Sequence, residues 1–164
     1  MSIRRAVILL LLTAACKPDR AKVTELPDSV TSLAFRELLT ENSSGERART
    51  LCAGYARFDQ NSGEWTYTDP PSSVIALLAQ SGHKVRPHSQ CNPVQDRSAD
   101  RLLDSASGIP VIDLTLLNEF EQRADTTIVT GDYVCGGTCG FRGRIRIWLR
   151  DGKLRSRLEI EAVS

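Results

Sequence analysis

Residues 139–162 read CGFRGRIRIWLRDGKLRSRLEIEA, and they predict an antiparallel β-hairpin. Asp151-Gly152 separates two runs in which apolar and polar residues alternate, and this dipeptide favours the positive φ angles of a two-residue hairpin turn. With the turn at this place, the predicted buried face pairs Leu149 with Leu154, Ile147 with Ser156, and Ile145 with Leu158.

The other face of this hairpin is basic. A candidate strip for an anionic partner consists of Arg144, Arg146, Trp148, Arg150, Arg155 and Arg157. Arg146 is predicted to lie opposite Arg157, and directly opposed like charges are unfavourable. Carboxylates such as Asp132 or Glu159, or an anionic partner, would compensate. The strip is either a docking surface for phospholipid head groups or an acidic envelope polymer, or a solvated face whose long side chains cover Trp148.

Upstream of the hairpin, helical patterns come first and strand patterns follow. Asp28 or Ser29 can cap a helix from Val30 to Glu41, Asp69-Pro70-Pro71 can open a second helix that ends at Gly82, and a short helix is predicted from Asp100 to Ser105. Strands are predicted over 51–58, 109–117, 126–135, 139–150 and 153–162, with a turn over 60–64 and an irregular segment over 83–99.

These elements predict an α+β fold. N-terminal helices would pack on one face of an antiparallel sheet of four or five strands that ends in the β-hairpin. Such a helix-first chain with a long curved meander is similar to the cystatin-like and NTF2-like folds. That analogy implies one specific alternative for function, which is a small-molecule pocket between the helices and the sheet, although a fold alone does not determine function.

The first residues predict export. Arg4 and Arg5 precede the apolar run 6–12, and small residues lead to Cys16, which is the order of a secretory signal peptide. Leu12-Thr13-Ala14-Ala15-Cys16 resembles the lipobox of bacterial lipoproteins, with Thr13 where Leu is usual. The resemblance implies a signal peptide over 1–15 and lipidation of Cys16. The polar residues that follow, with two prolines, predict a flexible tether over 16–28, and the predicted helices and strands then form a single α+β domain over 29–164. Cleavage of an ordinary signal nearby is the alternative.

Composition limits the classes of partner. The chain of 164 residues has 21 basic and 20 acidic residues, and loss of Arg4 and Arg5 with the signal would leave 19 basic residues against the same 20 acids. A nearly neutral chain is not expected to bind nucleic acid by bulk charge. Lys17 carries no Asp-type inner-membrane retention signal, so the expected place is the periplasmic face of the outer membrane.

Four cysteines remain besides Cys16: Cys52, Cys91, Cys135 and Cys139. An even number in an exported chain predicts two disulfides, for which three pairings exist. We favour Cys135–Cys139, because that pair is local, and therefore Cys52–Cys91.

The segment Cys135-Gly-Gly-Thr-Cys139 lies between two predicted strands, and it is interpreted as a hairpin turn closed by a disulfide. Two chemical alternatives remain, a redox-active disulfide and a Cu(I) site of two thiolates. A redox cysteine usually lies at a helix N-terminus, and a Cu(I) site usually recruits His or Met. His83 and His88 are interpreted as loop histidines.

The hairpin also resembles the C-terminal hairpin of uncharacterised bacterial envelope lipoproteins with the pattern aromatic-x-Cys-Gly-Gly-x-Cys-Gly, then a strand, Asn/Asp-Gly and a further strand. Leu154 to Leu158 lacks the Trp of that pattern. The residues around Cys52 and Cys91 resemble a second cysteine pair of the same family. The resemblance covers residues 51–164 and supports the Cys52–Cys91 pairing, but it implies no activity.

No nucleophile elbow, zinc-protease helix, Walker loop or dinucleotide fingerprint occurs in the sequence. We therefore expect a non-catalytic binding or scaffold module, anchored by lipid in the cell envelope, with no cofactor and no metal. The thiol activity at Cys135 and Cys139 and the pocket of NTF2-like type are the alternatives.

Overall fold

The computed structural model describes residues 26–40, 49–96, 99–136 and 139–163. The predicted signal peptide, Cys16 and the tether as far as residue 25 lie outside these ranges. The elements in chain order are α1 (Asp28–Thr40), β1 (Thr50–Asp59), β2 (Glu64–Thr68), α2 (Ser72–Ala79), β3 (Lys84–Pro87), the 3-10 helix η1 (His88–Gln90), β4 (Cys91–Asp96), β5 (Ala99–Asp104), β6 (Ile112–Arg123), β7 (Thr126–Gly136), β8 (Cys139–Arg150) and β9 (Lys153–Val163).

Within the described residues, the fold is dominated by one mixed sheet of seven strands in the order β2-β1-β6-β7-β8-β9, with β3 also beside β1. β1 runs parallel to β3 and β6, and the other neighbours are antiparallel. β4 and β5 form a separate two-stranded ribbon. The prediction of an antiparallel sheet of four or five strands under N-terminal helices is therefore wrong, since the described chain is mostly β with two α-helices.

The missed strands have short or irregular sequences. β2 begins at Glu64, where the predicted turn ends, and no strand was predicted there. β3 is only four residues long and ends in Pro87. β5 was predicted as a helix from Asp100 to Ser105, and it pairs instead with β4. These strands are held by backbone hydrogen bonds to distant partners, which hydrophobic periodicity does not reveal.

The C-terminal hairpin has the predicted register. Leu149 pairs with Leu154, Ile147 with Ser156, and Ile145 with Leu158. Asp151 and Gly152 both have positive φ angles, 52° and 70°, as a tight turn at this dipeptide requires. Leu149 and Leu154 are 57% and 38% exposed, so the buried face begins only at Ile147.

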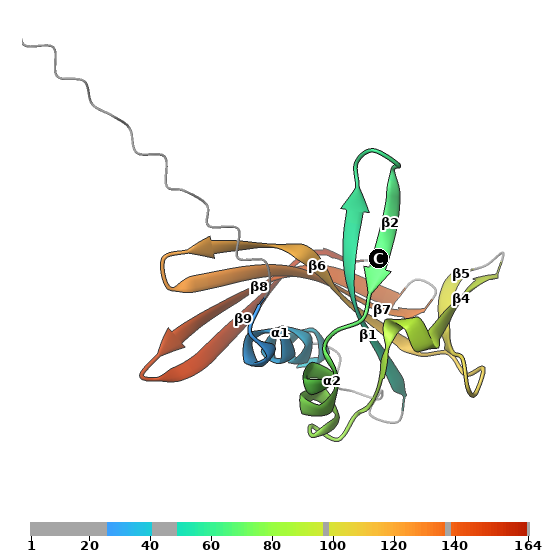
Figure 1. Ribbon diagram of the computed structural model, residues 1–164, viewed down its shortest axis with the longest axis horizontal. Coiled ribbons are helices and arrows are strands. Elements are labelled where there is room, and N and C mark those ends of the chain that lie inside the picture. Colours follow the sequence, from blue (N-terminus) through green and yellow to red (C-terminus); the bar gives the residue numbers. More distant parts are fainter. Residues whose placement is uncertain (1–25, 41–48, 97–98, 137–138, 164) are drawn as a thin grey trace, which may run out of the picture.

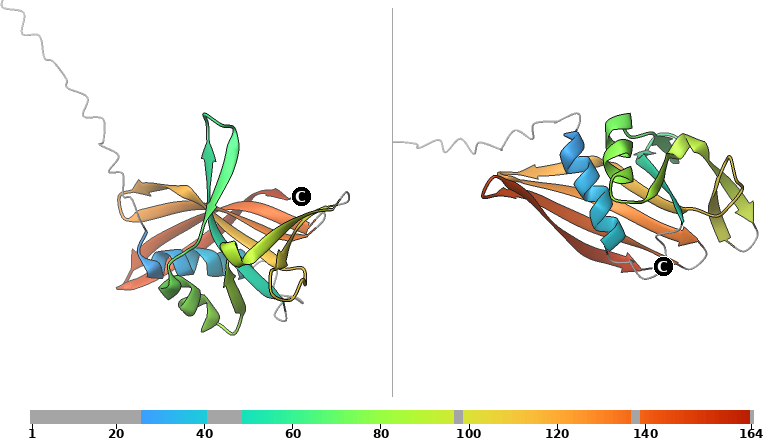
Figure 2. Two further views of the ribbon diagram at one scale, coloured as in Figure 1. Left: turned by 45° about the vertical axis from the view of Figure 1, so that its right-hand side comes forward. Right: turned by 90° about the horizontal axis from the view of Figure 1, so that it is seen from below.

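One side of the sheet forms the core. α1 crosses the strands on this side, and α2 lies beside it (Figures 1 and 2). Phe35 and Leu38 of α1 pack with Leu114, Leu116 and Ile145 in one cluster of buried side chains, to which α2 contributes Val74 and Leu78. Apolar side chains therefore occupy the place between helices and sheet where a pocket of NTF2-like type was considered.

The start of α2 differs from the prediction. Its first turn is preceded by Pro71, which makes no side-chain cap. Asp69 was predicted to open this helix, but its carboxylate accepts hydrogen bonds from the backbone N–H (2.8 Å) and the hydroxyl (2.6 Å) of Ser89. Asp69 thereby fixes η1 beside the segment that leads into α2.

Candidate functional site

The side of the sheet that turns away from α1 and α2 is called the outer face here. Side chains alternate between the two sides of a strand. Because Leu114 and Leu116 of β6 point into the core, Asp113 and Thr115 lie on the outer face. On β7, Asp132 lies next to the core residue Tyr133 and pairs in register with Thr115.

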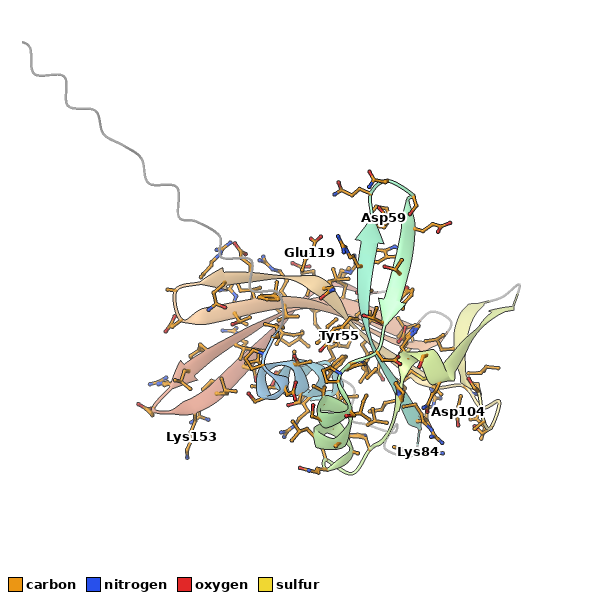
Figure 3. All side chains as sticks on the ribbon, viewed as in Figure 1. Tyr55, Asp59, Lys84, Asp104, Glu119 and Lys153 are labelled. Carbon is orange, nitrogen blue, oxygen red and sulfur yellow. A yellow bond between two sulfur atoms is a disulfide. The ribbon has the colours of Figure 1, made fainter. Side chains whose placement is uncertain are left out.

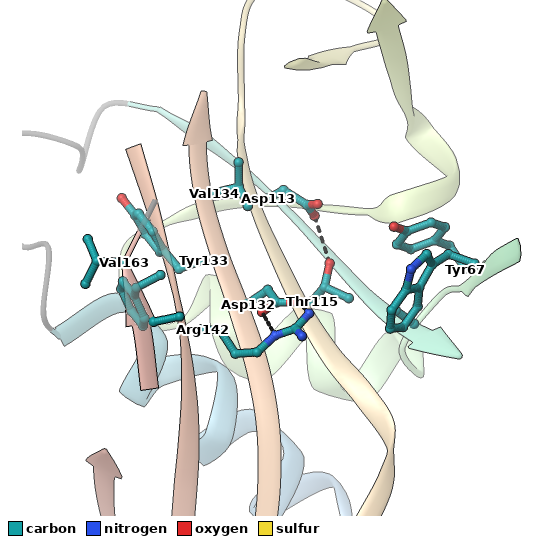
Figure 4. Close-up of a pocket in the computed structure, with 12 residues that line it drawn as sticks. Tyr67, Asp113, Thr115, Asp132, Tyr133, Val134, Arg142 and Val163 are labelled. Atoms are coloured by element: carbon teal, nitrogen blue, oxygen red, sulfur yellow. Dashed lines mark hydrogen bonds and ion pairs between the residues drawn. The ribbon is translucent and has the colours of Figure 1, made fainter. Parts of the chain in front are cut away.

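A hollow of about 440 Å³ lies on this outer face (Figure 4). The β1–β2 hairpin rises from the sheet on the side opposite to the helices (Figure 1), and its strand β2 contributes Trp65 and Tyr67 to the lining. The remaining lining comes from Ala56, Asp113, Thr115, Asp132, Tyr133, Val134, Phe141, Arg142, Ala162 and Val163. We call this cavity the hollow.

Asp113 is the half-buried carboxyl group of the hollow. Its Oδ1 accepts a hydrogen bond of 3.2 Å from the Thr115 hydroxyl (Figure 4). Burial raises the pKa of Asp113 to about 7; the Thr115 hydrogen bond opposes this shift, and the negative charge of Asp132 adds to it. Asp113 therefore changes its charge near neutral pH.

Asp132 and Arg142 form a two-pronged ion pair on neighbouring strands. Arg142 Nε donates to Asp132 Oδ1 at 2.7 Å, and Arg142 Nη2 donates to Oδ2 at 2.8 Å. This pairing raises the pKa of Arg142 above its ordinary value. Because both carboxylate oxygens accept from one guanidinium, Asp132 is held as a fixed anion at the side of the hollow.

Tyr67 turns its hydroxyl toward Asp113 across the hollow (Figure 4). Burial raises the pKa of Tyr67 above its ordinary value, and the charges of Asp113 and Asp132 raise it further. The phenol is therefore neutral at neutral pH and can donate a hydrogen bond.

The ring of His88 in η1 packs against the ring of Tyr67. The two rings stack with centroids 4.5 Å apart and planes 4° apart. Burial lowers the pKa of His88, against the opposing charge of Asp69. Gly54 leaves the space for His88, since a Cβ at Gly54 would lie 2.8 Å from His88 Cβ. His88, predicted as an ordinary loop residue, thus helps to position the wall of the hollow.

Both predicted disulfides are present. Cys52–Cys91 joins β1 to the start of β4 with the Cα atoms 6.4 Å apart, and Cys135–Cys139 joins β7 to β8 with the Cα atoms 5.3 Å apart. Residues 137 and 138 of the intervening loop lie outside the described ranges. In the part of the chain that is described, no group of three or more His, Cys, Asp and Glu side chains is arranged to hold a metal ion.

The basic strip is interleaved with carboxylates. Arg146 lies opposite Arg157, as predicted, and it pairs with Glu159 at 3.1 Å. Arg144 lies 3.5 Å from Glu121 and 3.7 Å from Glu161, and Arg150 lies 3.8 Å from Asp151. Arg155 is opposite Trp148. Glu159 is thus a compensating carboxylate, whereas Asp132, the other one considered, pairs with Arg142 at the hollow.

Other charged residues lie away from the hollow. Figure 3 places Asp59 at the tip of the β1–β2 hairpin and Lys153 at the β8–β9 turn, while Lys84 and Asp104 lie together near β3. Asp104 is buried, accepts a hydrogen bond of 2.8 Å from the Ser107 hydroxyl, and lies 3.9 Å from Arg86. This cluster ties the loop after β5 to β3, and we assign it a structural role.

The residues of the hollow were largely missed from the sequence. Trp65 and Tyr67 belong to the unpredicted strand β2. Asp113 stands inside the apolar run Ile112-Asp-Leu-Thr-Leu, and an acidic residue in such a run is the one signal that marks it for attention. Even so, nothing local in the sequence brings it to an aromatic wall.

No protein-family model, curated protein or solved structure matches this chain. The resemblance of the cysteine hairpin to envelope lipoproteins therefore remains a prediction. None of the helices in the described ranges is both long and apolar enough to span a membrane.

Proposed function

We propose that the chain is a non-catalytic binding module of the bacterial cell envelope that holds a small organic ligand in the hollow. The observation that carries this proposal is the combination of an aromatic wall, a half-buried carboxyl group and a fixed Arg–Asp pair around one cavity of about 440 Å³. Ligand sites are typically cavities of this size, with mostly apolar walls and a few fixed polar groups.

The state of the two carboxyl groups favours binding over catalysis. Hydrolysis by a pair of carboxyl groups needs both of them free to exchange a proton or to attack. Asp132, the second carboxylate of the hollow, has both oxygens engaged by Arg142. Asp113 and Tyr67 remain to contact a ligand.

The alternatives from the sequence have less support. A Cu(I) site needs Cys135 and Cys139 as thiolates, and they are joined in a disulfide. A redox cysteine usually lies at a helix N-terminus, whereas this pair joins the strands β7 and β8. A pocket between helices and sheet would need the space that Phe35, Leu38 and Leu116 occupy. The hollow on the outer face carries the proposal for these reasons.

Fluorescence of Trp65 tests the proposed site. Trp65 and Trp148 are the two tryptophans of the chain, and only Trp65 lines the hollow. In a Trp148→Phe variant, a library of small aromatic, amine and sugar fragments is expected to contain compounds that change the emission saturably. The matched Trp65→Phe variant, which keeps Trp148, should not respond to the same compounds. A library without any such compound contradicts the proposal.

Localisation to the cell envelope is the second part of the proposal. A lipid anchor at Cys16 and export to the periplasmic face of the outer membrane are supported by the signal-like residues 1–15 and by two disulfides, which persist in oxidising compartments. Expression in a diderm bacterium with an alkyne analogue of palmitate should label the wild-type chain in the membrane fraction. A Cys16→Ser variant should lose the label, and labelling that persists in this variant contradicts lipidation at Cys16.

A further inference from the structure

The carboxylates of the outer face differ in whether a cation accompanies them. Asp132 pairs with Arg142, Glu159 with Arg146, and Glu121 with both Arg123 and Arg144. Glu161 lies 3.7 Å from Arg144. Within the described ranges no arginine, lysine or histidine forms an ion pair with Asp113, whose hydrogen bond comes from the neutral hydroxyl of Thr115. The carboxyl group of the hollow thus lacks the cation that these neighbours have.

The aromatic rings of the hollow also favour a positively charged ligand. Trp65 and Tyr67 are 43% and 48% exposed, so each has surface available to a ligand. The faces of aromatic rings attract cations, and Trp does so most strongly. A group placed between these rings and Asp113 would therefore be attracted from both sides when it is positively charged.

The available oxygen limits the shape of this cation. Asp113 Oδ1 already accepts from Thr115, which leaves Oδ2 as the oxygen for a ligand. A guanidinium uses both oxygens of a carboxylate, as Arg142 does on Asp132, whereas an ammonium group needs one. The geometry therefore suits a compact ammonium group.

We propose that the ligand of the hollow is a small organic amine, bound in its protonated form with the ammonium on Asp113 and its apolar part against Trp65 and Tyr67. This inference rests on the proposed function and specifies the ligand class of the same site. The groups that face Asp113 are Asp132 of β7 with its partner Arg142 of β8, and Tyr67 of β2 backed by His88. Asp132 adds negative potential, and Tyr67 supplies a neutral donor.

The raised pKa of Asp113 agrees with this placement. Burial and the charge of Asp132 disfavour its ionised form, and a bound cation would reverse this by favouring the carboxylate. Binding of an amine is thus expected to release a proton at pH 6 and to strengthen as the pH rises toward 8.

Calorimetry on the full-length chain at pH 8 tests the amine with three probes of one shape: phenethylamine, the neutral 2-phenylethanol, and the anionic phenylacetate. We expect the amine to bind about tenfold more tightly than the alcohol, because it gains a charge-assisted hydrogen bond and a cation–π contact. Phenylacetate should bind most weakly. An Asp113→Asn variant should lower the affinity for the amine to that for the alcohol. The matched Asp125→Asn change in the exposed β6–β7 turn should leave the preference for the amine intact.

The comparison of probes on the wild-type chain needs no variant, so a folding defect in Asp113→Asn would leave the test valid. Equal affinity for amine and alcohol, tighter binding of phenylacetate, or an unchanged preference in Asp113→Asn would each overturn the amine assignment. The proposed function would survive those outcomes wherever Trp65 fluorescence still reports a ligand. No measurable binding of the amine also overturns the assignment, and the fragment screen then decides the proposed function separately.

Discussion

Asp113 links the stability of the protein to pH. Its folded pKa of about 7 lies above the ordinary value of 3.8, so the folded chain keeps a proton that the unfolded chain has released. The contribution of Asp113 to the free energy of unfolding is therefore greatest at low pH. It is lost as the pH rises from about 4 to about 7, and the protein stays less stable above that pH. Asp113→Asn should remove the loss and raise the free energy of unfolding at pH 8 by about 1–2 kcal/mol, a figure reduced for partial solvent exposure.

Urea unfolding at pH 3, 5, 6.5 and 8 measures this effect. The wild-type chain and Asp113→Asn should have similar stability at pH 3 and diverge as the pH rises. Asp125→Asn, on an exposed turn, serves as the control and should follow the wild-type curve. A constant difference between Asp113→Asn and the wild-type chain at every pH would show that the substitution acts through packing and that the carboxyl group has an ordinary pKa.

Gly54 tests the support behind Tyr67. A Cβ at this position would lie 2.8 Å from His88 Cβ and 3.0 Å from His88 Cγ, so His88 would have to leave its place on the Tyr67 ring. We expect Gly54→Ala to lower the free energy of unfolding by about 1–3 kcal/mol. In a double-mutant cycle, adding His88→Gly should recover part of this loss, because both the clashing Cβ and the ring are gone. Strictly additive losses would contradict the contact.

At the scale of elements, the C-terminal hairpin was predictable and the hairpin that forms the site was not. β8 and β9 alternate in sequence and are joined by Asp151-Gly152, so their turn and register follow from local rules. β2 and β3 both pair with β1, at its opposite ends, and α2 separates them in the chain. Such pairing depends on contacts between distant residues, and a four-residue strand that ends in Pro87 has no periodicity of its own.

The two disulfides should contribute unequally to stability. Cys52 and Cys91 are 39 residues apart, whereas Cys135 and Cys139 are 4 apart. In the chain-entropy account, replacing the first pair by Ala should cost about 4 kcal/mol and replacing the second about 2 kcal/mol. Thermal unfolding of both double variants under oxidising conditions measures the difference, with reduced wild-type protein as reference. A larger loss from the short-loop pair would contradict this account.

The opposed arginines of β8 and β9 predict unequal effects on stability. Arg146 pairs with Glu159, while Arg157 faces Arg146 and makes no ion pair with a residue in the described ranges. Arg157→Ala should therefore raise the free energy of unfolding by about 0.5 kcal/mol. Arg146→Ala should leave it nearly unchanged, because it relieves the same repulsion but also removes the ion pair with Glu159. The gain from Arg157→Ala should shrink in 1 M NaCl because salt screens exposed charges. Destabilisation by Arg157→Ala would indicate an attractive partner for this side chain.

At the scale of the whole molecule, the helices and the hollow lie on opposite sides of the sheet. The hydrophobic pattern predicted one packed side, and α1 and α2 cover it. The hollow is lined from β1, β2, β6, β7, β8 and β9, so its residues come together only when the complete sheet has formed. The sequence therefore predicted the disulfides and the hairpin, which depend on local spacing or on few alternatives, but it did not predict the site.

The central claim is that ligand binds at the hollow on the outer face, and the two tryptophan indole N–H resonances of the ¹⁵N-labelled full-length chain test it most directly. During titration with phenethylamine or with any hit from the fragment screen, the Trp65 resonance should shift to saturation, together with the backbone amides of Asp113 and Thr115. The Trp148 resonance, on the basic strip, should stay in place. Saturable shifts at Trp148 or in the α1–α2 core, with Trp65 unmoved, would contradict the account.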